Sequence, residues 1–469
     1  MRVALVVDDE YESQVLARDA LRLAGFESIL IASSRAEALD ITPEIFDTLD
    51  LLVVDRNIWE TSDQTPSVDV GDRLLLDLLK LAPGRPVIVF TGWVDSPLFQ
   101  SALDMSTQIM INNPDGFLPQ IMVLEKDQTA DLVGRAKRLL RFISLLEEIE
   151  IDTEDDVDEI TRRLMRRLAS ISNGRRISVK KLGGGRSGST VWACTVFDVT
   201  GNVIARYVSK ETSDISGGKG FLGLQSAAMA SMVASHKMQV FGMSGRRALD
   251  VFQSAGDSPI SLWQLVRVDG ALAEQLLVRL ARGLQPPLVS AATSVTIAQA
   301  VEHFVKWDDL ANILRERFDC GLNPNLMVAS KRDHQHGDLH GDNILVSGDQ
   351  VLLIDFDMQG VASRAVDPLT LLLSWYLHPD GPGFETTRPT VEQLIAIVAG
   401  YGPYDVDNGG IVRSISEWIQ TEVSGARDRW ASVLAYSLRQ FKYHSEAEAP
   451  ITYARLDGLV RKALEILAE

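Results

Sequence analysis

The segment from His334 to Asp357 constrains this 469-residue chain more than any other stretch. Its sequence is HQHGDLHGDNILVSGDQVLLIDFD, in which Asp338 and Asn343 are five residues apart and Asp355 follows an apolar run. Two short strands are expected here, Ile344–Val346 and Val351–Ile354, joined by the polar turn 347–350. Antiparallel pairing of these strands would bring Asp355 back beside Asn343.

Two carboxylates and one side-chain amide in this arrangement suit the transfer of a phosphoryl group. One carboxylate can accept the proton of an attacking hydroxyl group. The second carboxylate and the amide oxygen can hold Mg²⁺ against the phosphates of a nucleotide. The alternative is a plain hairpin whose acidic residues only occupy its turns.

The motif HGDLHGDN followed by IDFD resembles the aminoglycoside phosphotransferase and choline kinase branch of the protein-kinase-like superfamily. The resemblance implies that Asp338 is the catalytic base and that Asn343 and Asp355 are magnesium ligands. It also implies that His336 and Asp367 brace the catalytic loop. Asp367 could equally serve only as the N-cap of a helix over 368–376.

A glycine-rich stretch, LGGGRSGSTV at residues 182–191, lies between two expected strands. Glycine lets backbone N–H groups approach phosphates without a clash from Cβ. The residues expected to bind ATP through this loop are Gly183, Gly184, Gly185, Ser187 and Gly188. Lys210 follows on the next strand pair, where the resemblance places a phosphate-binding lysine. A glycine-rich hairpin without a ligand is an equally good account of the stretch taken alone.

One residue of the kinase pattern is missing. Kinases usually pair the strand lysine with a glutamate on the following helix, but the helix expected over 224–236, LQSAAMASMVASH, has no acidic residue. A nucleotide-binding pseudokinase, used as a switch or scaffold, therefore stays an alternative to an active enzyme. Ser261–Val268 is expected to form the strand and hinge that hold adenine, and 269–277 the connection between two lobes.

Residues 1–145 alternate short apolar runs with helix-period segments, which predicts a parallel α/β sheet. Polar residues follow its strands: Asp8 and Asp9 the first, Asp55 the third, Thr91 the fourth and Lys126 the fifth. The carboxyl ends of parallel strands converge on one crevice. Three carboxylates in one crevice repel one another unless a divalent cation lies among them.

This set of residues resembles the receiver domain of bacterial response regulators, which implies a flavodoxin-like fold. The resemblance implies that Asp55 is the phosphoacceptor and that Asp8 and Asp9 hold Mg²⁺. Thr91 and Lys126 would contact the phosphoryl group. The sequence departs from the receiver pattern in the segment RNIW, which follows Asp55. A histidine kinase or another phosphodonor is the partner that two-component signalling of this kind implies.

Helical segments with single apolar stripes lie between the two patterns. One covers 129–151, and a second is expected to open with a capping box at Thr153 and Asp156. The expected domains are a receiver at 1–145, a helical linker at 146–175 and an α+β bilobal kinase-like domain at 176–469. Its small lobe would cover about 176–268 and its large lobe about 269–469. The stripes pack against their own domains or form a signalling or homodimer seam.

The composition excludes several classes of function. A formal net charge of −18 argues against binding to nucleic acid or to an anionic membrane surface. No apolar run approaches the ~18 residues that span a membrane. Cys194 and Cys320 form no metal-ligand pattern, and the start MRVALVVDDE turns acidic too early for a secretory signal. These features predict a cytoplasmic protein.

The expected function is a signalling phosphotransferase that uses ATP and Mg²⁺ and is controlled by its receiver. The acceptor is a hydroxyl group of an unidentified small molecule or protein. Acidic residues near Asp380 and in Glu417–Asp428 could attract a cationic acceptor.

Overall fold

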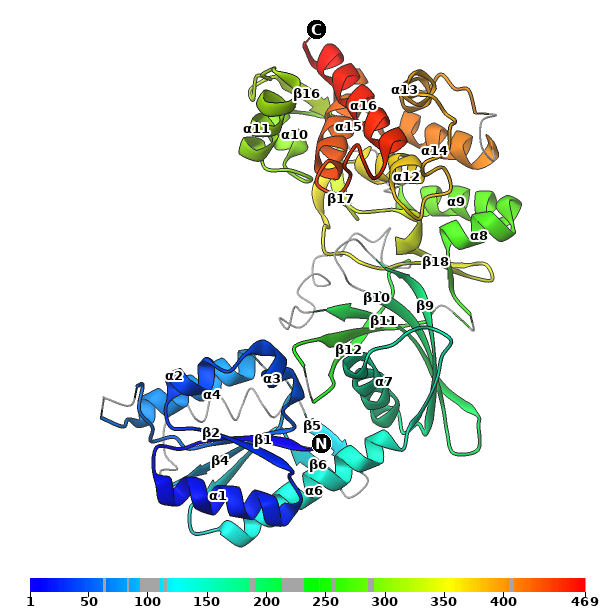
Figure 1. The fold of residues 1–469 in the computed structure, drawn as a ribbon. Helices are drawn as coiled ribbons and strands as arrows, with labels where there is room; N and C mark the ends of the chain where they lie inside the picture. Colours follow the sequence, from blue (N-terminus) through cyan, green and yellow to red (C-terminus); the bar gives the residue numbers. More distant parts are fainter. Residues whose placement is uncertain are drawn as a thin grey trace. The chain divides into compact units, whose positions relative to one another are not determined.

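The chain forms two compact units in the computed structural model of Figure 1. The first unit contains Met1–Lys181, Ser189–Gly217 and Lys237–Phe252, and the second contains Leu182–Gly188, Gly218–His236 and Gln253–Glu469. The structure describes residues 1–61, 65–81, 84–92, 110–113, 116–184, 190–212, 232–243, 245–254, 256, 258–285, 291–404 and 409–468. None of the helices in these ranges is long and apolar enough to cross a membrane.

Five parallel strands form the first sheet, in the order β2-β1-β3-β4-β7. Their bounds are β1 Val3–Val7, β2 Ser28–Ala32, β3 Leu51–Val54, β4 Val87–Thr91 and β7 Ile121–Glu125. If the strands of this sheet are numbered along the chain, their order is 2-1-3-4-5, which is the flavodoxin-like order. The predicted flavodoxin-like fold is therefore confirmed.

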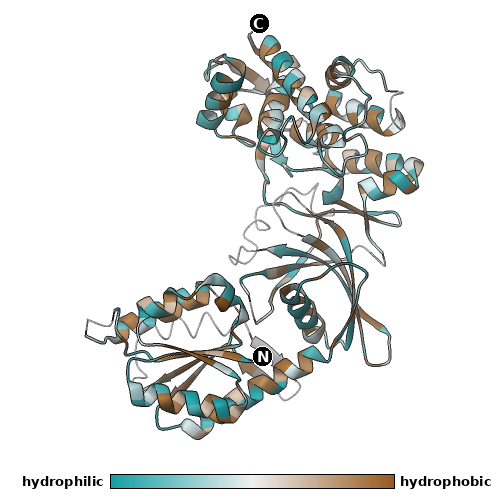
Figure 2. Cartoon of the chain, viewed as in Figure 1, coloured by the Kyte–Doolittle hydropathy of each residue, from teal (hydrophilic) through white to brown (hydrophobic). Residues whose placement is uncertain are grey.

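Helices cover both faces of this sheet (Figure 1), which explains why its strands are apolar almost throughout (Figure 2). Alternate residues of β1 define the faces: Ala4 and Val6 pack on the side of α1 and α6, whereas Leu5 packs on the side of α2, α3 and α4. The helices are α1 Tyr11–Ala24, α2 Arg35–Leu39, α3 Pro43–Thr48, α4 Val68–Leu81 and α6 Thr129–Glu147. A small antiparallel pair, β5 Met110–Asn113 and β6 Gly116–Pro119, precedes β7 in the chain.

A second sheet, most of which belongs to the first unit, contains six strands in the order β12-β13-β11-β10-β9-β8. Their bounds are β8 Glu150–Asp152, β9 Arg176–Gly184, β10 Thr190–Phe197, β11 Val203–Thr212, β12 His236–Phe241 and β13 Ala248–Gln253. Helix α7 (Glu159–Ile171) packs on this sheet, and its Leu164 and Leu168 lie in one buried cluster with Trp192 of β10.

The same cluster continues into the helices of the first sheet. Leu139 and Phe142 of α6 are buried in it together with Leu164 of α7. The two sheets of the first unit therefore share one hydrophobic core, because α6 and α7 contribute to both.

The expected linker at 146–175 contains a strand as well as a helix. Strand β8 pairs in parallel with β9, so the chain enters the second sheet before α7 begins. Helix α7 starts after Asp158, whose carboxylate accepts a hydrogen bond from the backbone N–H of Thr161 at 2.8 Å. The capping box predicted at Thr153 and Asp156 is therefore wrong, and Thr153 Oγ1 instead accepts a bond that closes a local turn.

The second unit is mainly helical, with three small groups of strands. Its helices are α8 Leu262–Val268, α9 Gly270–Leu284, α10 Ile297–Val301, α11 Trp307–Phe318, η2 Gly341–Asn343, α12 Val366–Leu377, α13 Val391–Ala399, α14 Gly409–Glu422, α15 Ala426–Gln440 and α16 Pro450–Ala468. Its strands are β14 Ile260–Ser261 with β18 Ile344–Ser347 and β19 Gln350–Leu353, β15 Thr293–Thr296 with β16 Met327–Ser330, and β17 Arg332–Gln335 with β20 Gly360–Ser363. Helix α12 is buried on all sides and forms the centre of this unit.

The strand and hinge predicted over Ser261–Val268 are wrong, because this segment is helix α8 after a two-residue strand. Ser261 Oγ accepts from the backbone N–H of Gln264 at 3.2 Å, and Gln264 Oε1 accepts from the N–H of Ser261 at 3.1 Å. This reciprocal capping box fixes the start of a helix. The expected connection over 269–277 lies within α9. Of the helix expected over 224–236, residues up to 231 lie outside the described residues, and His236 begins β12.

The segment RNIW, which departs from the receiver pattern, contains a buried ion pair. Arg56 Nε lies 2.7 Å from Asp72 Oδ1, and Arg56 Nη2 lies 3.0 Å from Asp72 Oδ2. Both side chains are only 1% exposed. Asp72 is on α4, so this bidentate pair ties the loop after β3 to that helix.

The change Asp72→Asn is expected to lower the free energy of unfolding by about 3–5 kcal/mol, because it leaves a buried guanidinium without its charge partner. Asp69→Asn, an exposed position on the same helix, is the matched control and should change stability by less than about 0.5 kcal/mol. Chemical denaturation of the full chain measures both values. Equal effects of the two changes would contradict the expected role of the pair.

Candidate functional site

The predicted hairpin of the second unit is confirmed. Strands β18 and β19 are antiparallel, with Ile344 opposite Leu353. The N–H of Ile354 donates to the carbonyl oxygen of Asn343 at 3.1 Å. The hairpin therefore places Asp355 next to Asn343.

The catalytic-type loop is held by a buried carboxylate. Asp367 Oδ2 accepts from the N–H of His336, and Asp367 Oδ1 accepts from the N–H of Gly337, both at 2.9 Å. Burial raises the pKa of Asp367, against the lowering effect of His336 and these two N–H donors. Helix α12 begins at Val366, so Asp367 lies in its first turn and is not its N-cap. Of the two predicted roles, the structure supports the brace.

His336 connects the loop to the end of the hairpin. Its Nδ1 accepts from the N–H of Asp338 at 3.3 Å, and its Nε2 lies 2.8 Å from the carbonyl oxygen of Ile354. Because Nδ1 is an acceptor and Ile354 offers an acceptor, the proton belongs on Nε2. His336 thus ties Asp338 to the strand that leads to Asp355.

The side chain of Asn343 is hydrogen-bonded to the backbone of Asp338. Asn343 Nδ2 donates to the backbone carbonyl of Asp338 at 2.8 Å, so the amide oxygen of Asn343 is directed away from this bond. The Asp338 side chain is 26% exposed, and Arg439 Nη1 of α15 lies 3.4 Å from its Oδ1. Asp355 has a φ of 66°, a left-handed conformation that is uncommon outside glycine and that is found at functional sites.

A partly exposed carboxylate, a side-chain amide oxygen and a second carboxylate therefore occur within one loop and hairpin. Asn343 and Asp355 offer the oxygen ligands that Mg²⁺ prefers. Sequence reasoning did not identify Arg439, because it is far from the motif in the chain and only the packing of α15 brings it to Asp338.

A second group of possible metal ligands lies in this unit. The ligand atoms of Asp342, His378 and Asp380 are all within 4.8 Å of one another. The ring of His378 stacks on that of His340, with 4.8 Å between centroids. No sequence pattern joins these residues, since α12 separates them.

Two acidic residues of the segment Glu417–Asp428 are buried in contacts within the fold. Glu422 is buried and lies 2.5 Å from Arg364 Nη2. Asp428 is buried and accepts from Ser363 Oγ at 2.8 Å and from the N–H of Ser424 at 2.9 Å. Glu422 and Asp428 therefore hold the fold together, while the expectation that the segment Glu417–Asp428 attracts a cationic acceptor stays a prediction.

The nucleotide-binding residues predicted for the second sheet are placed in part. Gly183 and Gly184 end β9, whereas Gly185, Ser187 and Gly188 lie outside the described residues. Lys210 lies on β11 opposite Val191 of β10. Strands β9 and β10 thus flank the glycine-rich stretch as predicted.

The neighbour of Lys210 has a different role. Glu211 is buried and accepts from Trp192 Nε1 at 2.8 Å, from Thr161 Oγ1 at 3.1 Å and from Arg247 Nη1 at 2.8 Å. These partners lie on the α7 side of the sheet. Because successive strand residues point to opposite faces, Lys210 points to the other face.

The first unit brings the receiver-type carboxylates together. Oxygen atoms of Asp8, Asp9 and Asp55 lie within 4.8 Å of one another. Lys126 Nζ lies 3.0 Å from Asp8 Oδ2 and 2.8 Å from Asp55 Oδ2. Thr91, the last residue of β4, is fully buried. The group has the oxygen donors that a divalent cation would bind, with a lysine as counter-charge.

Charge crowding changes the ionisation of this crevice. Burial, followed by the neighbouring Asp55 carboxylate, raises the pKa of Asp8 to about 7, and burial raises the pKa of Asp9. Although burial lowers it, hydrogen bonding to Asp55 and attraction to both aspartates raise the pKa of Lys126. Asp55 Oδ1 also accepts from the N–H of Arg56 at 2.6 Å.

Residues 269–413 match the family model described as the phosphotransferase enzyme family. The matched segment lies within the second unit. This segment includes the catalytic-type loop, the hairpin and Asp367, and it ends before Arg439. A search of the curated proteins gave no match.

Three solved structures are similar to parts of the chain. A response regulator receiver domain protein from Clostridium thermocellum has 22% identity and a TM-score of 0.23, covering 31% of this chain and 99% of that chain. One from Methanospirillum hungatei has 19% identity and a TM-score of 0.21, covering 30% and 98%. The amicoumacin kinase hAmiN, solved with AMP-PNP, Ca²⁺ and Ami, has 14% identity and a TM-score of 0.30, covering 61% and 88%. The flavodoxin-like fold follows from the strand order of the first sheet itself.

Gly337→Ala is expected to destabilise the chain much more than Gly348→Ala. Both glycines have a positive φ, 82° and 59°, so both substitutions strain the backbone by about 1 kcal/mol. Only at Gly337 would a Cβ lie 2.2 Å from both the carbonyl oxygen of Met358 and His303 Nε2, which adds about 1–3 kcal/mol of overpacking. Thermal unfolding compares the two variants, and equal losses would contradict the packing described for this loop.

In a chelator, Asp8→Asn is expected to raise the free energy of unfolding at pH 8 by about 1–3 kcal/mol. With its pKa raised to about 7, Asp8 binds its proton more tightly in the folded state, so stability falls as the pH rises from about 4 through about 7. The variant removes this loss, and its effect should shrink at pH 4.

Asp127→Asn, an exposed position beside Lys126, is the control and should have no effect at either pH. Mg²⁺ should stabilise the wild-type chain more than Asp8→Asn. A loss of stability in Asp8→Asn that is the same at both pH values would contradict the charge crowding.

Proposed function

We propose that the chain is a cytoplasmic signalling phosphotransferase, which transfers the γ-phosphoryl group of ATP to a hydroxyl group under the control of its receiver-type domain. The observation that carries the proposal is the arrangement of Asp338, Asn343 and Asp355 around one hairpin. That hairpin lies within the segment that matches the phosphotransferase family.

Asp338 is the proposed catalytic base. Its carboxylate is partly exposed, so an acceptor hydroxyl can reach it, and a positioned base of this kind contributes about 10²–10⁴-fold to a rate. Bound Mg²⁺, held by Asn343 and Asp355, would supply positive charge against the ATP phosphates. His336 and Asp367 keep the base and the ligands at a fixed separation through the hydrogen bonds of the loop.

The glycine-rich loop and Lys210 are the further ATP-binding residues that the resemblance implies. Gly183 and Gly184 lead into that loop from β9, and Lys210 lies on β11, which β10 separates from β9 in the sheet. Backbone N–H groups near glycine form anion-binding concavities, and the lysine adds a point charge.

The acceptor is a small molecule or protein that offers a hydroxyl group. It must share Asp338 with Arg439, whose guanidinium lies at hydrogen-bond distance from the same carboxylate. The acceptor site is therefore bordered by a cation from α15, and the sequence-based expectation of an acidic acceptor site loses the support of Glu422 and Asp428.

A nucleotide-binding pseudokinase is the second candidate. The feature that favours it is the sequence of the helix expected over 224–236, LQSAAMASMVASH, which has no acidic residue where kinases usually carry a glutamate. In that case the chain would bind Mg·ATP as a switch or scaffold without turnover.

The receiver-type crevice would take its phosphoryl group from a histidine kinase or another phosphodonor. Asp55 is the proposed phosphoacceptor, with Asp8 and Asp9 as Mg²⁺ ligands and Thr91 and Lys126 as contacts of the phosphoryl group. The proximity of Lys126 to both Asp8 and Asp55 supports these roles.

Asp338→Asn is expected to keep Mg·ATP binding and to lose phosphoryl transfer by about 10²–10⁴-fold. Asp355→Asn is expected to lose both, because it removes a metal ligand. Calorimetry with Mg·ATP measures binding, and labelled ATP with aminoglycosides, choline-like alcohols and lysate proteins measures transfer.

Asp349→Asn, at the tip of the same hairpin and 86% exposed, is the matched control and should behave as wild type. Binding without any transfer, unchanged in Asp338→Asn, would favour the pseudokinase. Absence of Mg·ATP binding in the wild-type chain would contradict both candidates.

A further inference from the structure

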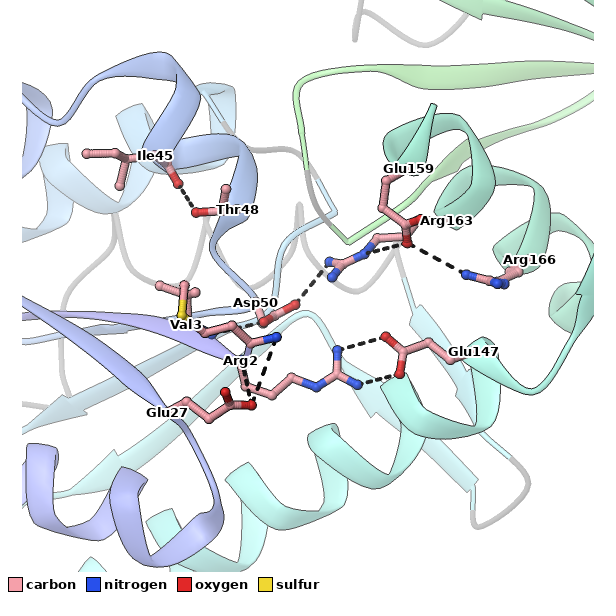
Figure 3. A network of polar contacts seen from close by, with 11 residues as sticks. Arg2, Val3, Glu27, Ile45, Thr48, Asp50, Glu147, Glu159, Arg163 and Arg166 are labelled. Carbon is pink, nitrogen blue, oxygen red and sulfur yellow. Dashed lines mark hydrogen bonds and ion pairs between the residues drawn. The ribbon is translucent and has the colours of Figure 1, made fainter. Parts of the chain in front are cut away.

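Asp50 occupies the amino-terminal end of the first sheet, directly before β3. It is 1% exposed, and its Oδ2 accepts from the N–H of Val3 at 3.0 Å. Its Oδ1 lies 3.0 Å from Arg163 Nη1 of α7 (Figure 3). A buried carboxylate of the receiver-type layer therefore holds the helix that packs on the second sheet.

Other contacts fix the same region of the first unit. Arg2 makes two bonds to Glu147 at the end of α6, of 3.0 and 2.6 Å (Figure 3). On α7, Glu159 lies 3.7 Å from Arg166. The first pair joins the start of β1 to the end of α6, whereas the second lies within α7.

The turn between β12 and β13 is packed into this region as well. A Cβ at Gly84, just before β4, would lie 2.2 Å from Phe241 Cβ, so only glycine permits this approach. A Cβ at Gly242, which follows Phe241, would likewise lie 3.2 Å from Leu164 Cδ2 of α7. The second sheet is thus in direct contact with the first.

A second arginine, Arg85, lies near Asp50 but is not hydrogen-bonded to it. The guanidinium of Arg85 is buried, and none of its nitrogen atoms has a hydrogen-bond partner among the described residues. Burial lowers the pKa of Arg85 to about 10. The carboxylates of Asp47 and Asp50 raise this pKa, and the charge of Arg163 lowers it further. Asp50 therefore has three cationic neighbours, Arg2, Arg85 and Arg163, of which only Arg163 is hydrogen-bonded to it.

The opposite side of α7 reaches the strand that carries Lys210. Thr161 Oγ1 donates to Glu211 Oε1 at 3.1 Å. Arg247 Nη2 lies 2.7 Å from Asp158, the N-cap of α7, and Arg247 Nη1 lies 2.8 Å from Glu211. Glu211 and Lys210 are adjacent on β11, so a shift of α7 moves the backbone that positions Lys210.

We infer that α7 couples the receiver-type crevice to the nucleotide site, with Asp50 exchanging its partner between Arg163 and Arg85. Asp50 and Asp55 flank the four residues of β3, so a change at the crevice reaches Asp50 through one short strand. The buried guanidinium of Arg85 lies over the ring of Phe46 but has no hydrogen bond among the described residues, which is costly, and a bond to Asp50 would offset the loss of the bond to Arg163. This is the two-state contact that a switch requires.

The contact also has a consequence for the phosphodonor. Helix α7 meets the amino-terminal end of the parallel strands, whereas Asp8 and Asp55 lie at their carboxyl ends. A phosphodonor can therefore approach the crevice without displacing α7.

The inference rests on the proposed function, and one experiment on the full chain tests it separately. Hydrogen exchange of the amides in α7 and β11 is measured with and without beryllofluoride in Mg²⁺, which mimics a phosphoryl group on Asp55. The wild-type chain is expected to change its β11 exchange rates by about 5-fold or more. Arg163→Gln should lose this response, and so should Arg85→Met.

Arg166→Gln is the matched control, because Arg166 lies on the same helix and binds Glu159 but not Asp50. It should keep the response. The unfolding temperature of each variant shows whether it is folded. A response that persists in Arg163→Gln, or that is absent from the wild-type chain, would overturn the inference. Mg·ATP calorimetry on the same samples tests the proposed function separately. If Mg·ATP does not bind, the exchange experiment still shows whether α7 and β11 respond to the crevice.

Discussion

The pairing of β18 with β19 is the interaction on which the candidate phosphotransferase site depends. It returns the chain so that Ile354 donates to the carbonyl of Asn343, and this bond sets the position of Asp355. His336 then ties the catalytic-type loop to the carbonyl of Ile354, and Asp367 holds the loop from α12. The chemistry of the site therefore rests on one hairpin and on the hydrogen bonds of His336 and Asp367.

The first unit shows a different principle. Its two sheets share a core through α6 and α7, so the receiver-type layer is part of the structure that carries Lys210. A flexible tether between two independent domains would transmit little. A shared core with an ion pair at Asp50 gives a mechanical connection between the crevice and the strand, because packed interiors transmit displacements.

Much of the fold and of the candidate sites could be predicted from the sequence, because the polar residues of both sites directly follow short apolar strands. The parallel sheet, the crevice of Asp8 and Asp55 and the hairpin beside Asn343 all follow from short apolar runs and the polar residues after them. The phosphotransferase match over 269–413 agrees with the motif resemblance.

The errors have equally physical causes. Ser261–Val268 is short and apolar, so its period does not separate strand from helix, and only the bonded capping box decides. The strand β8 within the expected helical linker was missed, because its three residues are too few to give a sequence pattern. Arg439 and Arg163 were missed as partners of aspartates, since contacts between distant elements leave no local signal.

A crystal structure of the full chain with Mg²⁺ and a non-hydrolysable ATP analogue tests the central claim most directly. The account predicts a metal ion bonded to Asn343 Oδ1 and to a carboxylate oxygen of Asp355, at about 2.1 Å, with the terminal phosphate facing Asp338. A nucleotide bound elsewhere, or metal and phosphates that make no contact with these residues, would contradict it.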